Sequence, residues 1–261
     1  MKKLLVVSSA LLCAAALFTG CRCKRGDAPA DTFTVGFDAE FPPYGYLDEA
    51  SGEYKGFDLD LAREVCARTG KTFVAKPINW DAKDMELNSG AIDCIWNGFT
   101  MQGREAGYTW TDAYVDNSQV VMVKAGSAIQ TLADLAGKNV AVQTDTPVQK
   151  ALSEGGSKAE LGATFQRLVV TPNYNNAVME LDSGAVDAVA VDIGVAKQKM
   201  ADMEGKFVML DEIVMTETYG IGFKLGNTGL RDLVWATYQD MLADGTVDKL
   251  AEQYGIDGVI H

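Results

Sequence analysis

Hydrophobic residues along the chain follow two alternating spacings, which predict strands and helices in turn. Between residues 56 and 69, Phe57, Leu61 and Val65 recur at every fourth position, the spacing of one face of an amphipathic helix. Apolar runs at 32–38 and 71–77 flank this segment and predict strands. Strands that alternate with helices indicate an α/β fold with a largely parallel sheet.

The same alternation continues through the second half of the chain. Strands are expected at 137–143 and 164–170, and the helix between them has Pro147 in its first turn. Two longer apolar stretches, at 118–126 and 218–226, are expected to be extended. Two further helical segments, at 229–245 and 247–255, close the chain.

One phrase of the sequence occurs twice. Residues 85–96 read MELNSGAIDCIW and residues 179–190 read MELDSGAVDAVA, with seven of the first nine positions identical. Each copy predicts the end of a helix, a left-handed glycine cap at Gly90 or Gly184, and a short strand at 91–96 or 185–191. This is a common supersecondary unit, and its simplest explanation here is two similar lobes.

The predicted fold is therefore two Rossmann-like α/β lobes joined by a two-strand hinge. Because the two extended stretches cross between the lobes, the first lobe should be discontinuous in sequence. We expect it to comprise 32–119 and 219–261, the second lobe 125–215, and the hinge strands to lie near 118–124 and 218–224.

The N-terminus has the features of an export signal. Lys2 and Lys3 precede an unbroken run of apolar and small residues that ends before Cys21. We interpret 1–20 as a signal peptide, Cys21 as a lipidated residue within a lipobox-like LFTGC, and 21–31 as a tether. The alternative is a transmembrane anchor, for which the run is at the short limit.

The amino-acid composition limits which partners and which kinds of site are expected. A net charge of −13 over 261 residues argues against nucleic acid as a partner, because such partners need a basic surface. The one histidine is His261 at the end of the chain, which excludes a histidine-based triad or zinc site, and no cofactor is expected. Cys66 and Cys94 either pair as a disulfide or remain as buried core thiols, and their positions favour the second.

Charged residues stand directly after the two repeated strands. In open α/β sheets, ligands bind beyond the carboxyl ends of strands. Asn97, Thr100 and Arg104 follow the first copy, and Asp192 follows the second. A cation on one wall of a cleft and an anion on the other would suit the carboxylate and ammonium of an α-amino acid. The alternatives are a surface role for Arg104 and a helix N-cap role for Asp192.

The order of motifs resembles a known family. GFDAEFPPYGY, GFDLDLAREV, DCIWNGFT, GKNVAVQTDT and AVDAVAVD occur in the order seen in polar-amino-acid solute-binding proteins of ABC importers, family 3. The resemblance covers about residues 32–257 and implies the type II periplasmic-binding fold.

The resemblance also implies roles for individual residues. Arg104 would hold the ligand α-carboxylate, with Gly98 and Thr100 before it and Thr146 donating from the other lobe. Asp145 stands where family members usually have glycine, and Asp192 would bind the ammonium group. Asp38, Phe41 and Tyr44 match the first loop of the family, where an aromatic residue packs on the ligand. Trp80 and Trp96 could add further aromatic faces to the site. Each of these aromatic residues could instead pack in the core.

The implied function is capture of an L-amino acid and its delivery to an ABC permease. The protein is expected to be monomeric, with the lipid anchor as its only membrane contact, in the periplasm or on the outer face of the cytoplasmic membrane. A cyclohexadienyl-dehydratase-like enzyme on the same fold, with Glu40 as acid or base, is the alternative. A chemosensory input domain is a third possibility, but the chain has no motif of a signalling module.

The ligand side chain is expected to be neutral polar or cationic. The motif positions supply several acids but a single cation, Arg104, so a second ligand carboxylate would meet like charge. Lys76, Lys83 or Lys124 could change this expectation by reaching the cleft.

Overall fold

Two large sheets and one small sheet organise the computed structural model, which describes residues 32–261. The predicted signal peptide, the lipidation of Cys21 and the tether at 21–31 lie outside the described residues. The first sheet has the strand order β5–β1–β6–β14–β7, formed by β1 (Thr32–Phe37), β5 (Thr72–Pro77), β6 (Cys94–Ile95), β7 (Tyr108–Trp110) and β14 (Gly222–Lys224).

The second sheet has the order β10–β9–β11–β8–β12, with β13 also paired to β8. Its strands are β8 (Val115–Lys124), β9 (Asn139–Gln143), β10 (Arg167–Thr171), β11 (Ala188–Asp192), β12 (Phe207–Met209) and β13 (Met215–Tyr219). A small antiparallel sheet consists of β2 (Glu40–Phe41), β3 (Gly45–Asp48) and β4 (Glu53–Lys55).

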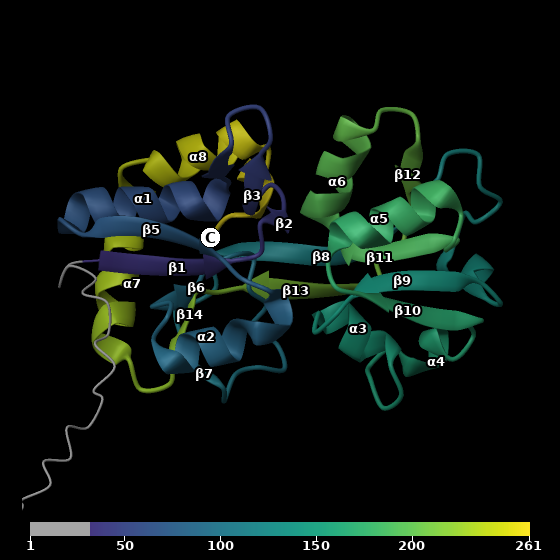
Figure 1. Ribbon diagram of the computed structural model, residues 1–261, viewed down its shortest axis with the longest axis horizontal. Helices are drawn as coiled ribbons and strands as arrows, with labels where there is room; N and C mark the ends of the chain where they lie inside the picture. The colour runs from purple at the N-terminus through teal and green to yellow at the C-terminus, as the bar shows by residue number, and fades with distance from the viewer. Residues whose placement is uncertain (1–31) are drawn as a thin grey trace, which may run out of the picture. The chain divides into compact units, whose positions relative to one another are not determined.

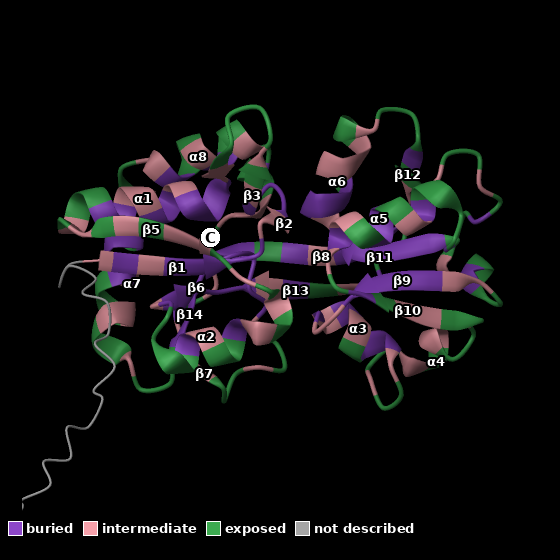
Figure 2. Cartoon of the chain, in the orientation of Figure 1, coloured by how far each residue is buried: buried purple, intermediate pink, exposed green. Residues whose placement is uncertain are grey.

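Helices cover both faces of each large sheet (Figure 1). The central strands are therefore buried on both sides, as Figure 2 shows for β9 and β11. The helices are α1 (Phe57–Thr69), α2 (Lys83–Ser89), α3 (Pro147–Leu152), α4 (Ala159–Gly162), α5 (Tyr174–Ser183), α6 (Ile193–Asp202), α7 (Thr228–Ala243) and α8 (Thr246–Tyr254), with 3-10 turns at Trp80–Ala82, Leu132–Leu135 and Asp257–Val259. No helix between residues 32 and 261 is both long enough and apolar enough to cross a membrane.

The two repeated phrases fold alike, one in each large sheet. Both helices, α2 and α5, end at a left-handed glycine, Gly90 with φ 74° and Gly184 with φ 82°. The aspartate of each copy then accepts a hydrogen bond from the first residues of the neighbouring parallel strand: Asp93 from the Thr34 amide at 2.7 Å and Asp187 from the Asn139 amide at 2.8 Å. The repeat thus fixes the same helix-to-strand turn twice.

The predicted helices and strands are present, with two differences. The strand expected at 91–96 pairs only over Cys94–Ile95, because Asp93 uses its side chain to bind the amide of Thr34. The stretch at 218–226 is not one strand: its first residues complete β13 of the second sheet, and Gly222–Lys224 form β14 of the first. The chain therefore passes from one large sheet to the other at Gly220 and Ile221.

Strands β8 and β13 pair antiparallel over Val115–Gln119 and Met215–Tyr219. Beyond Gln119, β8 continues into the second sheet beside β11, and at its other end Val115 bridges to Ile260. The predicted hinge segments, near 118–124 and 218–224, overlap these two strands (Figure 1). Their role in motion, and the exact lobe boundaries, remain predictions.

Candidate functional site

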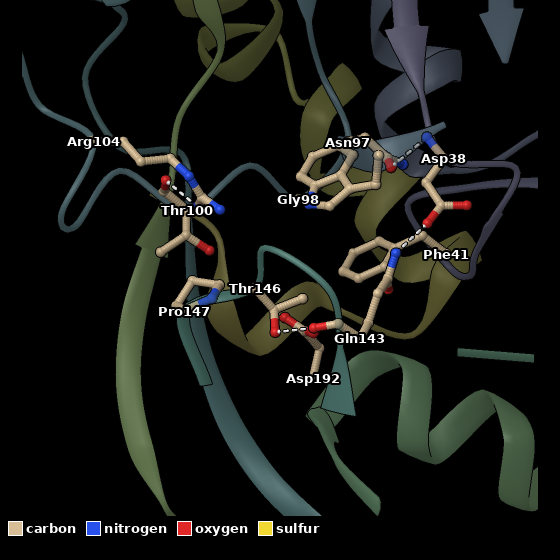
Figure 3. A pocket seen from close by; sticks show the side chains of 11 residues that line it. Asp38, Phe41, Asn97, Gly98, Thr100, Arg104, Gln143, Thr146, Pro147 and Asp192 are labelled. Atoms are coloured by element: carbon tan, nitrogen blue, oxygen red, sulfur yellow. Dashed lines mark hydrogen bonds between the residues drawn. The ribbon is translucent and has the colours of Figure 1, made fainter. Parts of the chain in front are cut away.

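A small pocket lies where four strands end. Asp38 follows β1, Asn97 follows β6, Gln143 ends β9 and Asp192 ends β11. The residues that line it are Asp38, Phe41, Trp80, Asn97, Gly98, Thr100, Arg104, Gln143, Thr146, Pro147 and Asp192. Because strands of both large sheets contribute, the pocket has the position expected for a ligand site in an α/β fold (Figure 3).

All the sequence-predicted ligand residues line this pocket except Tyr44 and Trp96. Tyr44 is 1% exposed and packs edge-on against Tyr219, with ring centroids 5.2 Å apart. Trp96 is fully buried and packs against Tyr114. The structure therefore places these two aromatic residues in the core that supports the pocket, while Phe41 and Trp80 contribute to its wall.

Arg104 lies on one wall with its guanidinium largely buried. Nη1 donates to the Thr100 carbonyl at 3.2 Å, and Nη2 donates to the Asp145 carbonyl at 2.5 Å. The guanidinium also lies over the Phe99 ring, 5.0 Å from its centroid. These contacts hold the planar fork in one orientation, which suits bidentate recognition of a carboxylate.

Asp145 connects this wall to the rest of the site. Its φ of 51° is in the left-handed region that favours glycine, which explains why the resemblance predicts glycine here. Its carboxylate pairs with Lys83, which is 1% exposed, and with Lys150 at 3.0 Å. Burial raises the pKa of Asp145, but Lys83, Lys150 and Arg104 outweigh it and lower the pKa below its ordinary value. The acid is therefore matched by cations and does not oppose a ligand carboxylate.

Thr146 begins helix α3, as the sequence predicts. Its hydroxyl accepts a hydrogen bond from the Gln149 amide at 3.3 Å and donates to the Gln143 carbonyl at 2.8 Å (Figure 3). Gly98, on the facing wall, has φ 54°, and a Cβ there would meet Phe41 at 2.7 Å. Only glycine fits this close approach.

A polar network spans the pocket between the two sheets. Gln143 donates to the Asp38 carboxylate at 2.7 Å, and the Asp38 amide donates to the Asn97 side chain at 2.9 Å (Figure 3). Burial raises the pKa of Asp38. Among residues 32–261, the buried Asn97 Nδ2 and Gln143 Oε1 atoms have no hydrogen-bond partner.

Asp192 lies at the bottom of the pocket and is 3% exposed. It occupies the N-cap position of α6, but its side chain makes no capping hydrogen bond. Tyr174 instead donates to Oδ2 at 2.8 Å, and Asn117 and Gln119 each donate to Oδ1 at 2.8 Å, where the Tyr219 hydroxyl donates as well. The carboxylate is thus oriented from four sides, which a capping role would not require.

Sequence reasoning missed Gln143, Pro147 and the residues that hold Asp192. Gln143 is the last residue of a predicted strand, so the expectation that ligands bind beyond the carboxyl ends of strands could have identified it. The residues that hold Asp192 include Asn117, Gln119 and Glu217, which lie in strands β8 and β13. Polar residues within these apolar strands near the predicted hinge could have indicated a buried polar site.

One further prediction concerns the cysteines. Within the described residues, Cys66 and Cys94 are both buried and form no disulfide, so the core-thiol interpretation is the one observed. Burial raises the pKa of Cys66 to about 11. Within residues 32–261, no three His, Cys, Asp or Glu side chains are grouped in a way that could hold a metal ion.

Comparison with known proteins shows which family the chain resembles. The family model for bacterial extracellular solute-binding proteins, family 3, matches residues 33–257. The probable ABC transporter arginine-binding protein ArtJ of Chlamydia trachomatis serovar D is 26% identical, over 98% of both chains. The histidine-binding periplasmic protein of Salmonella typhimurium is 30% identical, over 84% of this chain and 86% of its own.

Among solved structures, an ancestral arginine-binding protein bound to glutamine superposes with a TM-score of 0.78. It is 32% identical and covers 87% of this chain and 98% of its own. This likeness extends over both large sheets and supports the two-lobe type II fold. The chain belongs to family 3 of the bacterial extracellular solute-binding proteins.

Proposed function

We propose that this protein captures an L-amino acid in the pocket and delivers it to an ABC permease. One observation carries the proposal: Arg104 and Asp192, of opposite charge, both line the same pocket (Figure 3). An α-amino acid presents a carboxylate and an ammonium group a few bonds apart, and few other small solutes do. Charge-assisted hydrogen bonds at both ends would fix its orientation.

The ligand side chain is proposed to be neutral polar or cationic. Asp38 lines the pocket, and a wider hollow that shares Asp38 and Trp80 with it is also lined by Glu40, Asp81 and Glu86. A cationic side chain that points toward this mouth would meet acids, whereas a carboxylate would be repelled. The relatives named for arginine and histidine are consistent with this preference.

The lysines that could have supplied a second cation are engaged elsewhere. Lys76 pairs with Glu86 at 2.7 Å, and Lys83 pairs with Asp145. Neither they nor Lys124 belong to the pocket wall. Arg104 therefore remains the cation of the wall, which favours exclusion of aspartate and glutamate.

The chain is a binding protein and not an enzyme, as its family membership indicates. Glu40, the candidate acid or base for a dehydratase, lies on the wider hollow and not on the pocket wall. Anchoring through Cys21, a monomeric state and delivery to a permease complete the proposal.

A thermal-shift panel of all L-amino acids tests it with the mature domain. Ligand at about a hundredfold excess over Kd stabilises by about 2.7 kcal/mol. For a domain of this size, that predicts a rise in Tm of roughly 5–11 °C. No stabilisation by any L-amino acid would overturn the proposal, and glutamate or aspartate as the strongest stabiliser would overturn the preference for neutral polar or cationic side chains.

A further inference from the structure

Asp192 is accompanied by a second buried carboxyl group, Glu217 on β13, and each residue is 3% exposed. Within residues 32–261, neither carboxyl group forms an ion pair with a lysine or arginine; the donors that surround them are amides and hydroxyls. Two ionised carboxylates placed side by side in a protein interior repel each other strongly unless a cation or proton lies between them. The arrangement therefore needs one positive charge.

Two amides from β8 hold the pair together. Asn117 Nδ2 donates to Asp192 Oδ1 at 2.8 Å and to Glu217 Oε1 at 2.7 Å. Gln119 Nε2 donates to the same two oxygens at 2.8 Å and 2.6 Å. Because each amide bridges both acids, the two carboxyl groups cannot move apart without breaking these bonds.

The other oxygen of Glu217 distinguishes the two acids. Glu217 Oε2 is buried and has no hydrogen-bond partner within residues 32–261, whereas both oxygens of Asp192 accept hydrogen bonds. A carboxyl oxygen buried without a partner costs free energy in either state, but much less when the group is protonated than when it is ionised. The proton of the pair is therefore held by Glu217, and the charge by Asp192.

On the basis of the proposed amino-acid ligand, we propose that Glu217 is part of the binding site and that its shared proton is released when a ligand ammonium group docks at Asp192. The O–H bond of Glu217 breaks, its proton passes to solvent, and an N–H of the ammonium donates to the Asp192 carboxylate. One positive charge leaves the acid pair and one arrives. Thr100 lines the pocket, and its side chain is close enough to Glu217 to lower the pKa of that carboxyl group, so it connects the pair to the ligand space.

The pKa shifts of the two carboxyl groups support the proposed replacement of the proton by the ligand ammonium group. Burial, and then the neighbouring charge of Asp192, raise the pKa of Glu217 to about 8. Burial also raises the pKa of Asp192, while hydrogen bonds from Tyr219 and Tyr174 oppose that rise. The titratable groups that face the pair are Tyr44 from the first loop, Tyr174 from α5 and Tyr219 from β13, with Asp38 and Asp58 beyond them and Arg104 across the pocket.

The sign of the effect follows from linkage. A cation within a few ångströms lowers a carboxyl pKa by about 1–3 units, so the bound state holds fewer protons than the empty state near neutral pH. Affinity for an amino acid should therefore rise with pH, by up to about tenfold per pH unit, between about pH 6 and pH 8.

Calorimetry in two buffers of different ionisation enthalpy tests the proposal by counting released protons. The first probe is L-arginine, replaced by the strongest stabiliser of the amino-acid panel if arginine does not bind. The wild-type protein should release up to one proton near pH 7.5, whereas Glu217→Gln should release none and lose the pH dependence of Kd. Glu204→Gln, at an exposed glutamate, is the matched control and should behave as wild type.

A ligand without the ammonium group, 5-guanidinopentanoate, should bind weakly and release no proton from the wild-type protein. Wild-type binding of the amino acid without net proton release would overturn the role of Glu217 while leaving the proposed function intact. Failure of every L-amino acid to bind would overturn the proposed function itself. If Glu217→Gln is poorly folded, the wild-type proton count alone decides.

Discussion

Both ends of the pocket contain buried charged groups, but these charges are neutralised differently at the two ends. At the carboxylate end, Arg104 and Lys83 lie around Asp145, so the acid is matched and the guanidinium remains in excess. At the end proposed to bind the ammonium group, Asp192 and Glu217 are joined by neutral amides, and no lysine or arginine of the described residues pairs with either acid. The buried acid of the first end is balanced by cations of the protein, whereas we propose that the acid pair of the second end is balanced by a proton or by the ligand ammonium group.

This difference predicts how the loss of a group at each end should change ligand binding. Loss of a group at the balanced end removes an interaction but leaves its neighbours paired. Loss of a group at the unbalanced end changes the proton count as well. Variants at the two ends should therefore differ in pH dependence as much as in affinity.

The largest effect is expected for Arg104→Ala. Removing one partner of a buried charged pair costs roughly 2–5 kcal/mol, or about 30- to 5000-fold in Kd. Calorimetry with the preferred amino acid measures it, and circular dichroism confirms folding. Arg104→Lys should recover only part of the loss, because an ammonium lacks the bidentate fork. Weakening of less than about threefold in Arg104→Ala would place Arg104 outside the site.

Asp192→Asn should come next and should act on one functional group of the ligand. A charged hydrogen bond contributes about 1.5–3 kcal/mol, so amino-acid affinity should fall about tenfold to 150-fold. The matching ligand without its amino group should be nearly unaffected. Equal losses for both ligands would show that Asp192 supports the fold and does not contact the ammonium group.

The unbalanced end should also be visible in the stability of the ligand-free protein. Glu217 has a folded-state pKa of about 8, above the ordinary value of 4.5, so the folded state binds its proton more tightly than the unfolded state does. This stabilisation is fully present below about pH 4.5 and is lost as pH rises through about 8.

Glu217→Gln should therefore flatten the fall in Tm between pH 5 and pH 8. Each 1 kcal/mol removed from the pH dependence corresponds to roughly 2–4 °C. Part of the slope should remain, since burial raises the pKa of Asp58 to about 7. Differential scanning calorimetry without ligand gives the slopes, and identical slopes for wild type and variant would contradict the assignment.

The smallest effect is expected at Asp145. Asp145→Gly loses the ion pair but relieves the left-handed backbone, so its stability should stay within about 1 kcal/mol of wild type. Asp145→Ala loses the ion pair and keeps the strain, and should be about 1–2 kcal/mol less stable than Asp145→Gly. Urea unfolding measures both, and equal stabilities would show that the backbone conformation at 145 relaxes freely.

The sequence predicted the local elements well because their causes are local. The spacing of Phe57, Leu61 and Val65 gives one buried face of α1, and Gly90 and Gly184 end α2 and α5 as the repeated phrase predicts. Arg104 and Asp192 were predicted because ligands bind at strand ends in this kind of sheet, and both line the pocket.

The environment of those two side chains could not be predicted, because it depends on residues far apart in the chain. Lys83 meets Asp145 across 62 positions, and Glu217 meets Asn117 across 100. Whether Tyr44 and Trp96 face the ligand or the core also depends on packing, since an aromatic side chain suits either place.

By itself, therefore, the sequence determined the order of strands and helices, the duplicated turn and the opposite charges at two strand ends. Only the tertiary structure decided which of those charges are matched. Pairing of β8 with β13 brings Glu217 beside Asp192, and the loop after β9 brings Asp145 beside Lys83. The physical reason is that hydrophobic spacing acts over a few residues, whereas the charge state of a buried carboxyl group is set by every element that surrounds it.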